Sequence, residues 1–334
     1  MTTQWHQFTA LELGQKIEQQ EINPVDLTEY FLNRIKQLDP DNEIYVRLTE
    51  ERALKEATAA AYRAKMGQRR SLLDGVPISW KDLFDTAGIR TEAGTRLLEG
   101  RIPSEDADCL KRATLAGLVC LGKTNMPDLA FSGLGNNPRT GTGANPHDQT
   151  TKRVPGGSSS GAALSVYHGL APAAIGSDTA GSVRIPAAWC GLTGLKTTHG
   201  LISLNGSVPL SPSQDTVGPL TRDIADANEL CAILSGRKAA DLKGASVKGL
   251  RILRATTVFE DLVNPAIQSQ TDIALNELSR HGAKIIEGPV PSFHDVLECC
   301  NEHGYPGMLE GYACGETRSG NILTELTRPL ANVF

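Results

Sequence analysis

Three stretches of the sequence place side chains capable of acyl-transfer chemistry beside apolar runs. Lys81 ends the run 75–80, the serines of the string 156–161 stand ahead of an expected helix, and Ser182 lies in a turn that follows an expected strand. A serine hydroxyl attacks a carbonyl well only when a base removes its proton, and an uncharged lysine can be that base. Each stretch alone has a simpler interpretation, namely a solvated charge, a flexible loop and an ordinary turn.

A phosphate-binding loop is an alternative for the glycine-rich string 156–161, since such a turn before a helix can bind anions. The string lacks the Gly-Lys-Ser/Thr ending of a P-loop, and no Gly-x-Gly-x-x-Gly pattern opens a helix in this chain. The sequence therefore disfavours nucleotide binding.

Composition narrows the class of protein. The 334 residues carry 33 Lys and Arg against 38 Asp and Glu, a formal net charge of −5. This balance predicts no binding of nucleic acid or anionic membrane, and no apolar run approaches the ~18 residues that span a bilayer. The first residues lack the basic start and apolar stretch of a signal peptide, which predicts a cytoplasmic protein.

The cysteines and histidines show no metal-binding or disulfide pattern. Seven histidines are scattered without a ligand motif, and the seven cysteines have irregular spacing and no CxxC pair. We expect no bound metal and free thiols at every cysteine: Cys109, Cys120, Cys190, Cys231, Cys299, Cys300 and Cys314.

The N-terminal part of the chain is expected to be helical. Thr9 and Glu12 form a capping-box pattern ahead of a first helix. Asn23-Pro24 begins a second helix that ends at Asp39-Pro40. An Ala/Glu/Lys-rich stretch over 49–66 predicts a third.

Strands and helices then alternate. Strands expected at 75–80, 118–121 and 173–177 are separated by helices at 109–115 and 161–170, which indicates a largely parallel sheet.

Two further units are expected after these. Leu201–Leu204 and Val208–Leu210 flank Asn205-Gly206, which predicts a β-hairpin. A strand at 250–253, a helix beginning at Asn264-Pro265 and a strand at 284–286 form a second strand–helix–strand unit.

Considered together, the three polar stretches resemble the amidase signature family of serine hydrolases. The motifs stand in the family's order over about residues 73–222, with 77 residues from Lys81 to Ser158 and 24 from Ser158 to Ser182, as in the family. The matching text is GVPISWKD (75–82), GKTNMPDLAFSG (122–133), RVPGGSSSGAA (153–163), GSDTAGSVRIPAAWCGLTGLK (176–196) and SPSQDTVGP (211–219).

The resemblance implies a catalytic unit of serine, cis-serine and lysine. By position, Ser182 is the nucleophile, Ser158 is the bridging serine reached through a cis peptide bond from Gly157, and Lys81 is the base. A lysine accepts a proton only when uncharged. Because model lysines titrate near ~10.4, the pKa of Lys81 must fall by roughly 3 units, a shift that burial can supply. No cofactor and no metal are implied.

An oxyanion hole is also implied, formed by the main-chain N–H groups of Thr179, Ala180, Gly181 and Ser182. The commonest family pattern has two glycines before the nucleophile. Ala180 departs from it and adds a Cβ where an unusual backbone conformation is expected.

Two other sets of residues take their roles from the resemblance. Asp178 and Arg184 are expected to orient the signature loops, with a solvated surface pair as the simpler interpretation. Phe131, Ser132 and Gly133 are expected to form one wall of the acyl pocket.

The implied fold is a single amidase-signature domain over residues 1–334. It is an α/β fold with a mixed, largely parallel central sheet covered by α-helices on both faces. Its parts are a helical region over 1–70, a signature core over 73–222 and an incomplete C-terminal part over 223–334, since family members usually continue further. A sheet edge left open there predicts association, for example as a homodimer.

The implied function is hydrolysis of a small-molecule carboxamide through an acyl-enzyme. Two alternatives stay open, a glutaminase-type component of a tRNA-dependent amidotransferase and a truncated non-catalytic remnant. The amidotransferase branch commonly has glutamine where Ile185 stands and glycine where Ala180 stands, so both residues favour a stand-alone amidase.

Overall fold

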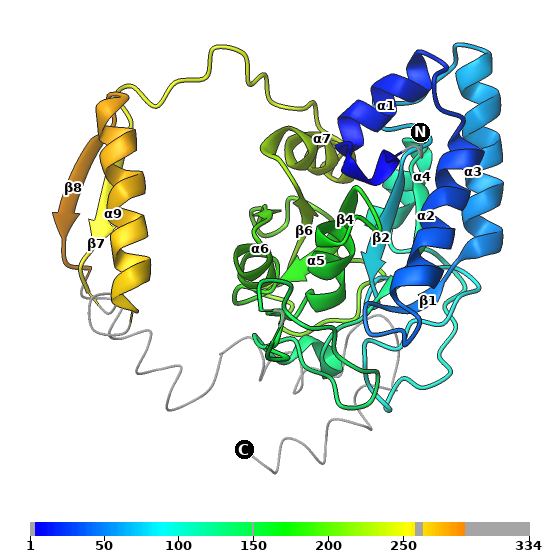
Figure 1. Cartoon of the computed structure of the whole chain (residues 1–334), viewed down its shortest axis with the longest axis horizontal. Helices are drawn as coiled ribbons and strands as arrows, with labels where there is room; N and C mark the ends of the chain where they lie inside the picture. The colour runs from blue at the N-terminus through cyan, green and yellow to red at the C-terminus, as the bar shows by residue number, and fades with distance from the viewer. Residues whose placement is uncertain (1–3, 149, 258–262, 291–334) are drawn as a thin grey trace.

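The computed structural model describes residues 4–148, 150–257 and 263–290, which form one six-stranded and one two-stranded sheet (Figure 1). The strands are β1 (Tyr45–Leu48), β2 (Pro77–Lys81), β3 (Val119–Thr124), β4 (Ala173–Asp178), β5 (Thr193–Gly194), β6 (Thr216–Thr221), β7 (Arg251–Ala255) and β8 (Lys284–Gly288). The α-helices are α1 (Ala10–Glu18), α2 (Pro24–Leu38), α3 (Glu50–Lys65), α4 (Asp108–Leu115), α5 (Ser160–Tyr167), α6 (Arg184–Cys190), α7 (Ile224–Ser235) and α9 (Pro265–Arg280). Short 3₁₀ helices are η1 (Trp5–Gln7) and η2 (Asp128–Ala130).

The larger sheet has the strand order β1-β3-β2-β4-β6-β5. Strands β3, β2 and β4 are parallel, while β1 pairs antiparallel with β3 and β6 pairs antiparallel with β4 and β5. All strands except β1 and β6 therefore run in one direction. The prediction of a mixed, largely parallel sheet is confirmed.

Both faces of this sheet are covered. Every residue of β2, β3, β4 and β6 is buried, and strands buried throughout require packing on each face. Helix α5 contacts these four strands, and α7 contacts β6 as well as α1 and α4. Helices α2 and α3 run side by side and also contact β3 (Figure 1). The sheet thus places the carboxyl ends of β2 and β4 next to each other inside the molecule.

The expected helix starts are confirmed in detail. Thr9 and Glu12 form a capping box at α1, and Asn23 accepts a hydrogen bond from the Val25 N–H at the start of α2. Asn264 caps α9 in the same way. Local capping chemistry fixes these positions because it needs only neighbouring residues.

The hairpin expected around Asn205-Gly206 is wrong. No strand forms over 201–210. The Gly206 carbonyl accepts a hydrogen bond from the Asp85 N–H at 2.8 Å, and the Val208 N–H donates to the Leu83 carbonyl at 2.9 Å. The turn exists, but its flanks bond to the segment after β2 instead of to each other.

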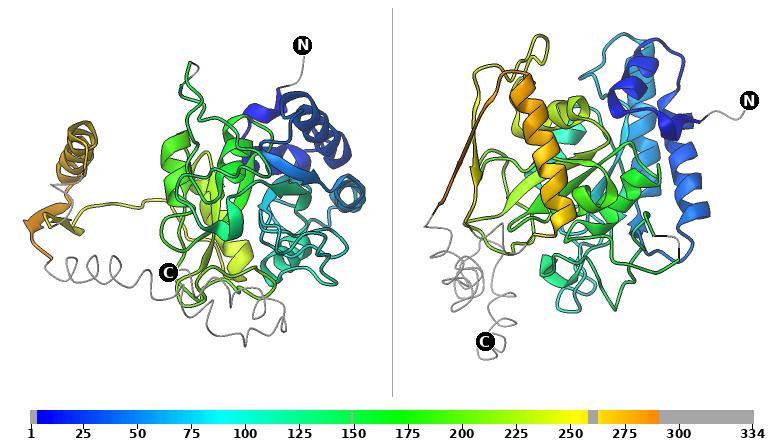
Figure 2. Two further views of the ribbon diagram at one scale, coloured as in Figure 1. Left: turned by 90° about the horizontal axis from the view of Figure 1, so that it is seen from below. Right: turned by 60° about the vertical axis from the view of Figure 1, so that its left-hand side comes forward.

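The expected second strand–helix–strand unit is confirmed as β7–α9–β8, a parallel pair with one crossover helix. In Figures 1 and 2 this unit lies apart from the larger sheet, at the end of an extended connection after α7. Four cysteines are free thiols, and Cys299, Cys300 and Cys314 lie outside the described residues. Among the helices of the described residues, none has the combination of length and apolar composition that a membrane span requires.

Candidate active site

Lys81 lies at the carboxyl end of β2, between β3 and β4, and is fully buried. Its Nζ donates to the Ser158 Oγ at 2.7 Å and to the Ser177 Oγ at 2.8 Å. Two predicted site residues, Lys81 and Ser158, are therefore in direct contact across 77 residues of sequence.

Burial controls the charge of this lysine. Removal from water lowers the pKa of Lys81 to about 7, although the carboxylates of Asp215 and Asp178 act in the opposite direction. No carboxylate is within hydrogen-bonding distance of Nζ among the described residues. A substantial fraction of the amine is therefore uncharged near neutral pH.

Ser158 precedes α5 and is fully buried. The Gly157–Ser158 peptide bond is cis, as the resemblance implied. The Gly157 N–H donates to the Gly133 carbonyl at 2.8 Å, which ties this segment to the loop after η2. The loop with the predicted acyl-pocket residues thus lies directly against the bridging serine.

Ser182 follows β4 in the turn that leads into α6, and 8% of its surface is exposed. Its carbonyl accepts a hydrogen bond from the Ser159 N–H at 3.1 Å, so the two predicted serine segments are joined through their main chains. The Ser182 Oγ makes no hydrogen bond to any residue that the structure describes. Hydrogen bonds of catalytic groups are often long without substrate and shorten when it binds.

Asp178 anchors the turn that carries Ser182. Its carboxylate is fully buried, accepts the N–H groups of Gly181 at 2.8 Å and Val183 at 3.1 Å, and forms a two-point ion pair with Arg184. Burial alone would raise the pKa of Asp178, but the bonds from Arg184 and from these N–H groups outweigh it and lower the pKa. A charged Asp178 therefore shapes the turn from inside, which a solvated surface pair would not do.

The unusual backbone conformation lies at Gly181, not at Ala180. Gly181 has φ of 131°, and a Cβ there would stand 2.7 Å from the Ile185 Cδ1. Ala180 is absent from the residues with positive φ and is exposed. The expectation that Ala180 occupies an unusual conformation is wrong, because the positive φ angle of this turn lies one residue later, at Gly181.

The predicted acyl-pocket residues form an open loop. Phe131 is half exposed, and Ser132 Oγ accepts a hydrogen bond from the Leu134 N–H at 3.1 Å. A Cβ on Gly133 would stand 3.5 Å from the Ile185 Cδ1. Ile185 therefore lies between this loop and the Ser182 turn, as an apolar side chain at the edge of the site.

Two residues near Lys81 were not assigned a role from the sequence. Ser177 is the second hydrogen-bond acceptor of Lys81. Asp215 accepts the Thr179 hydroxyl at 2.5 Å and the N–H groups of Leu210 and Ser211, and burial raises its pKa in spite of these bonds. Both residues stand inside the matching motifs, but a motif does not say that either side chain would face Lys81.

A second buried lysine lies on the neighbouring strand. Lys123 donates to the Phe84 carbonyl at 2.5 Å and to the Thr91 Oγ1 at 3.0 Å, and its Nζ is 3.6 Å from an Asp82 oxygen. These contacts hold the loop after β2 against β3. Lys123 therefore supports the position of Lys81 without a bond to either serine.

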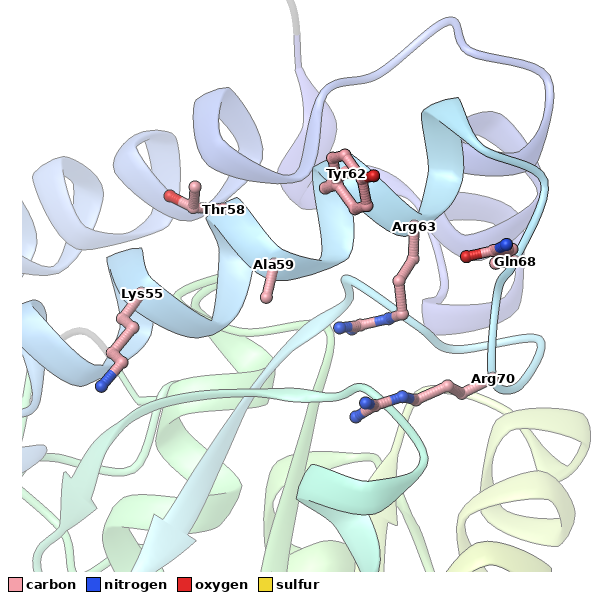
Figure 3. Close-up of a pocket in the computed structure, with 7 residues that line it drawn as sticks. All are labelled: Lys55, Thr58, Ala59, Tyr62, Arg63, Gln68 and Arg70. Atoms are coloured by element: carbon pink, nitrogen blue, oxygen red, sulfur yellow. The ribbon is translucent and has the colours of Figure 1, made fainter.

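Two cavities in the described structure differ in their distance from Lys81: a small one adjoins it and a larger one does not. A small cavity beside Lys81 is lined by Ser177, Ser207 and Asp215 together with apolar side chains. A larger one, of about 810 Å³, lies beside α3 and the segment that follows it, and is lined by Tyr62, Arg63 and Arg70 among others (Figure 3). It contains none of the residues around Lys81. No group of His, Cys, Asp or Glu able to hold a metal ion occurs among the described residues.

The fold and this pattern of motifs are those of a hydrolase acting on the carbon–nitrogen bonds of amides. A family model described as Amidase matches residues 26–307, and the chain belongs to that family.

Relatives of known name include two kinds of protein. The A subunit of the glutamyl-tRNA(Gln) amidotransferase of Acinetobacter baumannii is 35% identical, over 93% of this chain and 68% of its own length. The structure of a native peptide amidase from Stenotrophomonas maltophilia matches with a TM-score of 0.78 and 31% identity, over 91% of this chain and 67% of that one. The corresponding amidotransferase A subunit of Thermotoga maritima gives a TM-score of 0.76 and 27% identity, over 100% of this chain and 71% of that one.

Proposed function

We propose that this protein hydrolyses a carboxamide through an acyl-enzyme formed on Ser182, with Ser158 as proton relay and Lys81 as base. The observation that carries the proposal is the buried Lys81 Nζ, 2.7 Å from the Ser158 Oγ and with a pKa of about 7. A buried base that titrates near neutral pH, placed against a hydroxyl, is suited to general-base work.

The proton moves along this line during attack. Lys81 accepts the proton of Ser158, which accepts that of Ser182 as the Ser182 Oγ bonds to the carbonyl carbon. When the carbon–nitrogen bond breaks, the proton returns through Ser158 to the leaving nitrogen. Water then attacks the acyl-enzyme by the same relay, and the products are a carboxylate and ammonia or an amine.

The negative oxygen of the intermediate needs hydrogen-bond donors. The Gly181 N–H is bound to Asp178, so we assign the oxyanion to the N–H groups of Thr179, Ala180 and Ser182. Each such donor is typically worth roughly 3 kcal/mol in the transition state. Gly181 and Asp178 serve to hold the turn in shape.

Labelling with a fluorophosphonate tests the proposal. We expect one adduct by intact mass on the full-length protein and none on Ser182→Ala, with melting curves showing that both are folded. Hydrolysis of a panel of small aliphatic and aryl amides should then depend on Lys81 and Ser158. A cooperatively folded protein without an adduct would contradict the proposal and favour a non-catalytic remnant.

A second candidate function is that of the glutaminase component of a tRNA-dependent amidotransferase. Its support is the 35% identity to amidotransferase A subunits over 93% of this chain. Ile185 argues against it, since this apolar side chain at the edge of the site cannot form a hydrogen bond with the polar groups of a bound glutamine substrate. Glutamine hydrolysis that begins only when the partner subunits are added would favour this candidate over the stand-alone amidase.

The site residues themselves suggest no partner beyond a small amide. Phe131, Ser132 and Gly133 would contact its acyl group from the loop beside Ser158. A homodimer stays a prediction, to be tested by light scattering of the full chain.

A further inference from the structure

The Lys81 amine lies between two hydroxyl groups that come from different elements. Ser158 stands before α5, and Ser177 is the penultimate residue of β4. Strands β2 and β4 are paired in parallel with Trp80 opposite Ile175, which brings their carboxyl ends together. Ser177 is 7% exposed, and its Oγ is 2.8 Å from the Lys81 Nζ.

The number of donors on the amine makes this second hydroxyl important. A charged lysine has three N–H donors and no lone pair, whereas the uncharged amine has two N–H donors and one lone pair. To accept a proton from Ser158, Lys81 must turn that lone pair toward the Ser158 Oγ. An N–H must then find another acceptor, and within the described residues the only other hydrogen-bond partner of Nζ is the Ser177 Oγ.

Ser177 is itself held in place. Its backbone lies opposite Val217 of β6, and its carbonyl accepts the Ser159 hydroxyl at 3.2 Å. Ser177 also lines the small cavity that Asp215 and Ser207 line. The acceptor therefore has a fixed position against which the amine can orient.

We propose that Ser177 is a positioning residue, which accepts an N–H of Lys81 and so turns the lone pair of the uncharged amine toward Ser158. The inference rests on the proposed role of Lys81 as base. Without this acceptor the amine rotates about its Cε–Nζ bond, and an N–H faces Ser158 for part of the time.

The charges around Lys81 set the expected pH effect. Asp215 faces it from the segment before β6, and Asp178, paired with Arg184, faces it from the end of β4. A hydroxyl acceptor stabilises the charged amine more than the uncharged one, because charge-assisted hydrogen bonds are stronger. Loss of the Ser177 hydroxyl should thus lower the pKa of Lys81 further, and the acid limb of the rate profile should move to lower pH.

The test compares Ser177→Ala with Ser177→Thr, which restores a hydroxyl. For Ser177→Ala we expect kcat to fall about tenfold or more, with KM within about twofold, and the acid limb to move down by about one pH unit. Ser177→Thr should recover most of both. Ser165→Ala is the control, because it removes another buried hydroxyl, one that bonds to the Ala162 carbonyl and not to Lys81.

A second readout does not depend on activity. Titration of the Lys81 side chain by NMR in the full-length protein, assigned with Lys81→Met, should show the same downward shift in Ser177→Ala and not in Ser165→Ala. An unchanged titration and an unchanged acid limb would overturn the role of Ser177. A wild-type protein that neither hydrolyses amides nor reacts with a fluorophosphonate contradicts the proposed function instead, while the NMR titration still decides whether Ser177 orients the amine.

Discussion

The charge state of one side chain decides whether this site can work. In the part of the chain that the structure describes, no carboxylate forms a hydrogen bond with the Lys81 Nζ, and burial lowers the pKa of Lys81 to about 7. The burial that would make Lys81 a base near neutral pH also costs folding free energy at every pH below the ordinary lysine pKa of ~10.4, because the unfolded chain then holds the proton more tightly. This cost grows as pH falls toward about 7, the pKa of Lys81 in the folded protein, and is constant below it. Function and stability therefore have opposite requirements at this residue.

Replacing Lys81 by alanine should separate amides from esters. The amide nitrogen leaves only if it is protonated, whereas an alkoxide leaves more easily. Lys81→Ala should therefore reduce amide turnover at least ~100-fold, and the factor by which it reduces ester turnover should be about ten times smaller. Matched amide and ester substrates with the same acyl group measure this directly. In the wild type, kcat/KM for the amide should rise with pH through about 7, where Lys81 loses its proton. Equal losses on both substrates would contradict the leaving-group role.

Adding a Cβ at Gly181 should disturb the Ser182 turn, whereas removing the Cβ of the adjacent Ala180 should have little effect. Gly181→Ala forces a side chain into a φ of 131° and against Ile185, so fluorophosphonate labelling should slow by ~100-fold or more, since a misplacement of about 1 Å has that effect. Ala180→Gly is the matched control and should change the free energy of unfolding by less than about 1 kcal/mol. Labelling rates at equal concentration measure the effect of Gly181→Ala, and urea unfolding measures that of Ala180→Gly. A Gly181→Ala variant that is labelled at the wild-type rate would show that the positive φ at Gly181 does not restrict this position.

Sequence motifs can point to candidate site residues when the proposed chemistry requires a particular side chain at that position. Lys81, Ser158 and Ser182 belong to long motifs from which their proposed roles are taken, whereas Ser177 stands inside a motif that proposes no role for it. Its importance depends on the β2–β4 pairing, which determines the hydroxyl that Lys81 meets. A spacing along the chain carries no information about that contact.

At the scale of elements, local signals predict helices well and fail where partners are distant. The caps predicted for α1, α2 and α9 come from residues within a few positions of each helix start, and each is confirmed. The hairpin at Asn205-Gly206 is wrong because the Gly206 carbonyl and the Val208 N–H bond to the segment 83–85. An Asn-Gly turn indicates a reversal of the chain, but not which segment its flanks will pair with.

Helix α7 stabilises the start of α1 through one carboxylate. The buried Asp226 accepts the N–H groups of Ala10 at 2.7 Å and Leu11 at 2.9 Å, so it caps a helix that lies 216 positions away in sequence. Burial raises the pKa of Asp226 to about 6 despite these bonds. No local sequence pattern could reveal this cap, since the carboxylate comes from α7 and the N–H groups that it accepts come from α1.

Asp226→Asn should change how stability depends on pH. The folded-state pKa of about 6 lies above the unfolded value of about 3.9, so the folded protein binds more protons between these pH values and this group adds stability as pH falls from 6 to 4. The asparagine variant cannot titrate. The wild type should therefore gain on the variant by up to about 1.4 kcal/mol per pH unit over that range. Urea unfolding at several pH values measures the difference, and a constant difference would contradict the raised pKa.

At the scale of the whole molecule, the buried apolar side chains of the core cluster lie around the larger sheet and not in the β7–α9–β8 unit. The hydrophobic core cluster runs from Ala10 to Leu234, and no residue of β7, α9 or β8 belongs to it. Helix α9 has no buried residue, and Ile267 and Ile273 on it are more than half exposed. The larger sheet with the Lys81 site therefore has its own core, independent of the β7–α9–β8 unit.

This division predicts that residues 1–241 fold without the rest of the chain. The cut keeps α7 and the two hydrogen bonds between Asn228 and Ala240 that hold the end of this segment. We expect a cooperative thermal transition within about 5 °C of that of the full chain, since no member of the core cluster is removed.

A shorter fragment, 1–222, is the matched control. It removes α7 with its fully buried Leu230 and Leu234, each worth about 2–5 kcal/mol, and with the Asp226 cap of α1. Because domains are stable by only about 5–15 kcal/mol, this fragment should not fold. Calorimetry and fluorophosphonate labelling of both fragments decide the matter. A fragment 1–241 that unfolds without cooperativity would show that the Lys81 site depends on chain beyond α7, and a folded 1–222 would show that α7 is not part of the essential core.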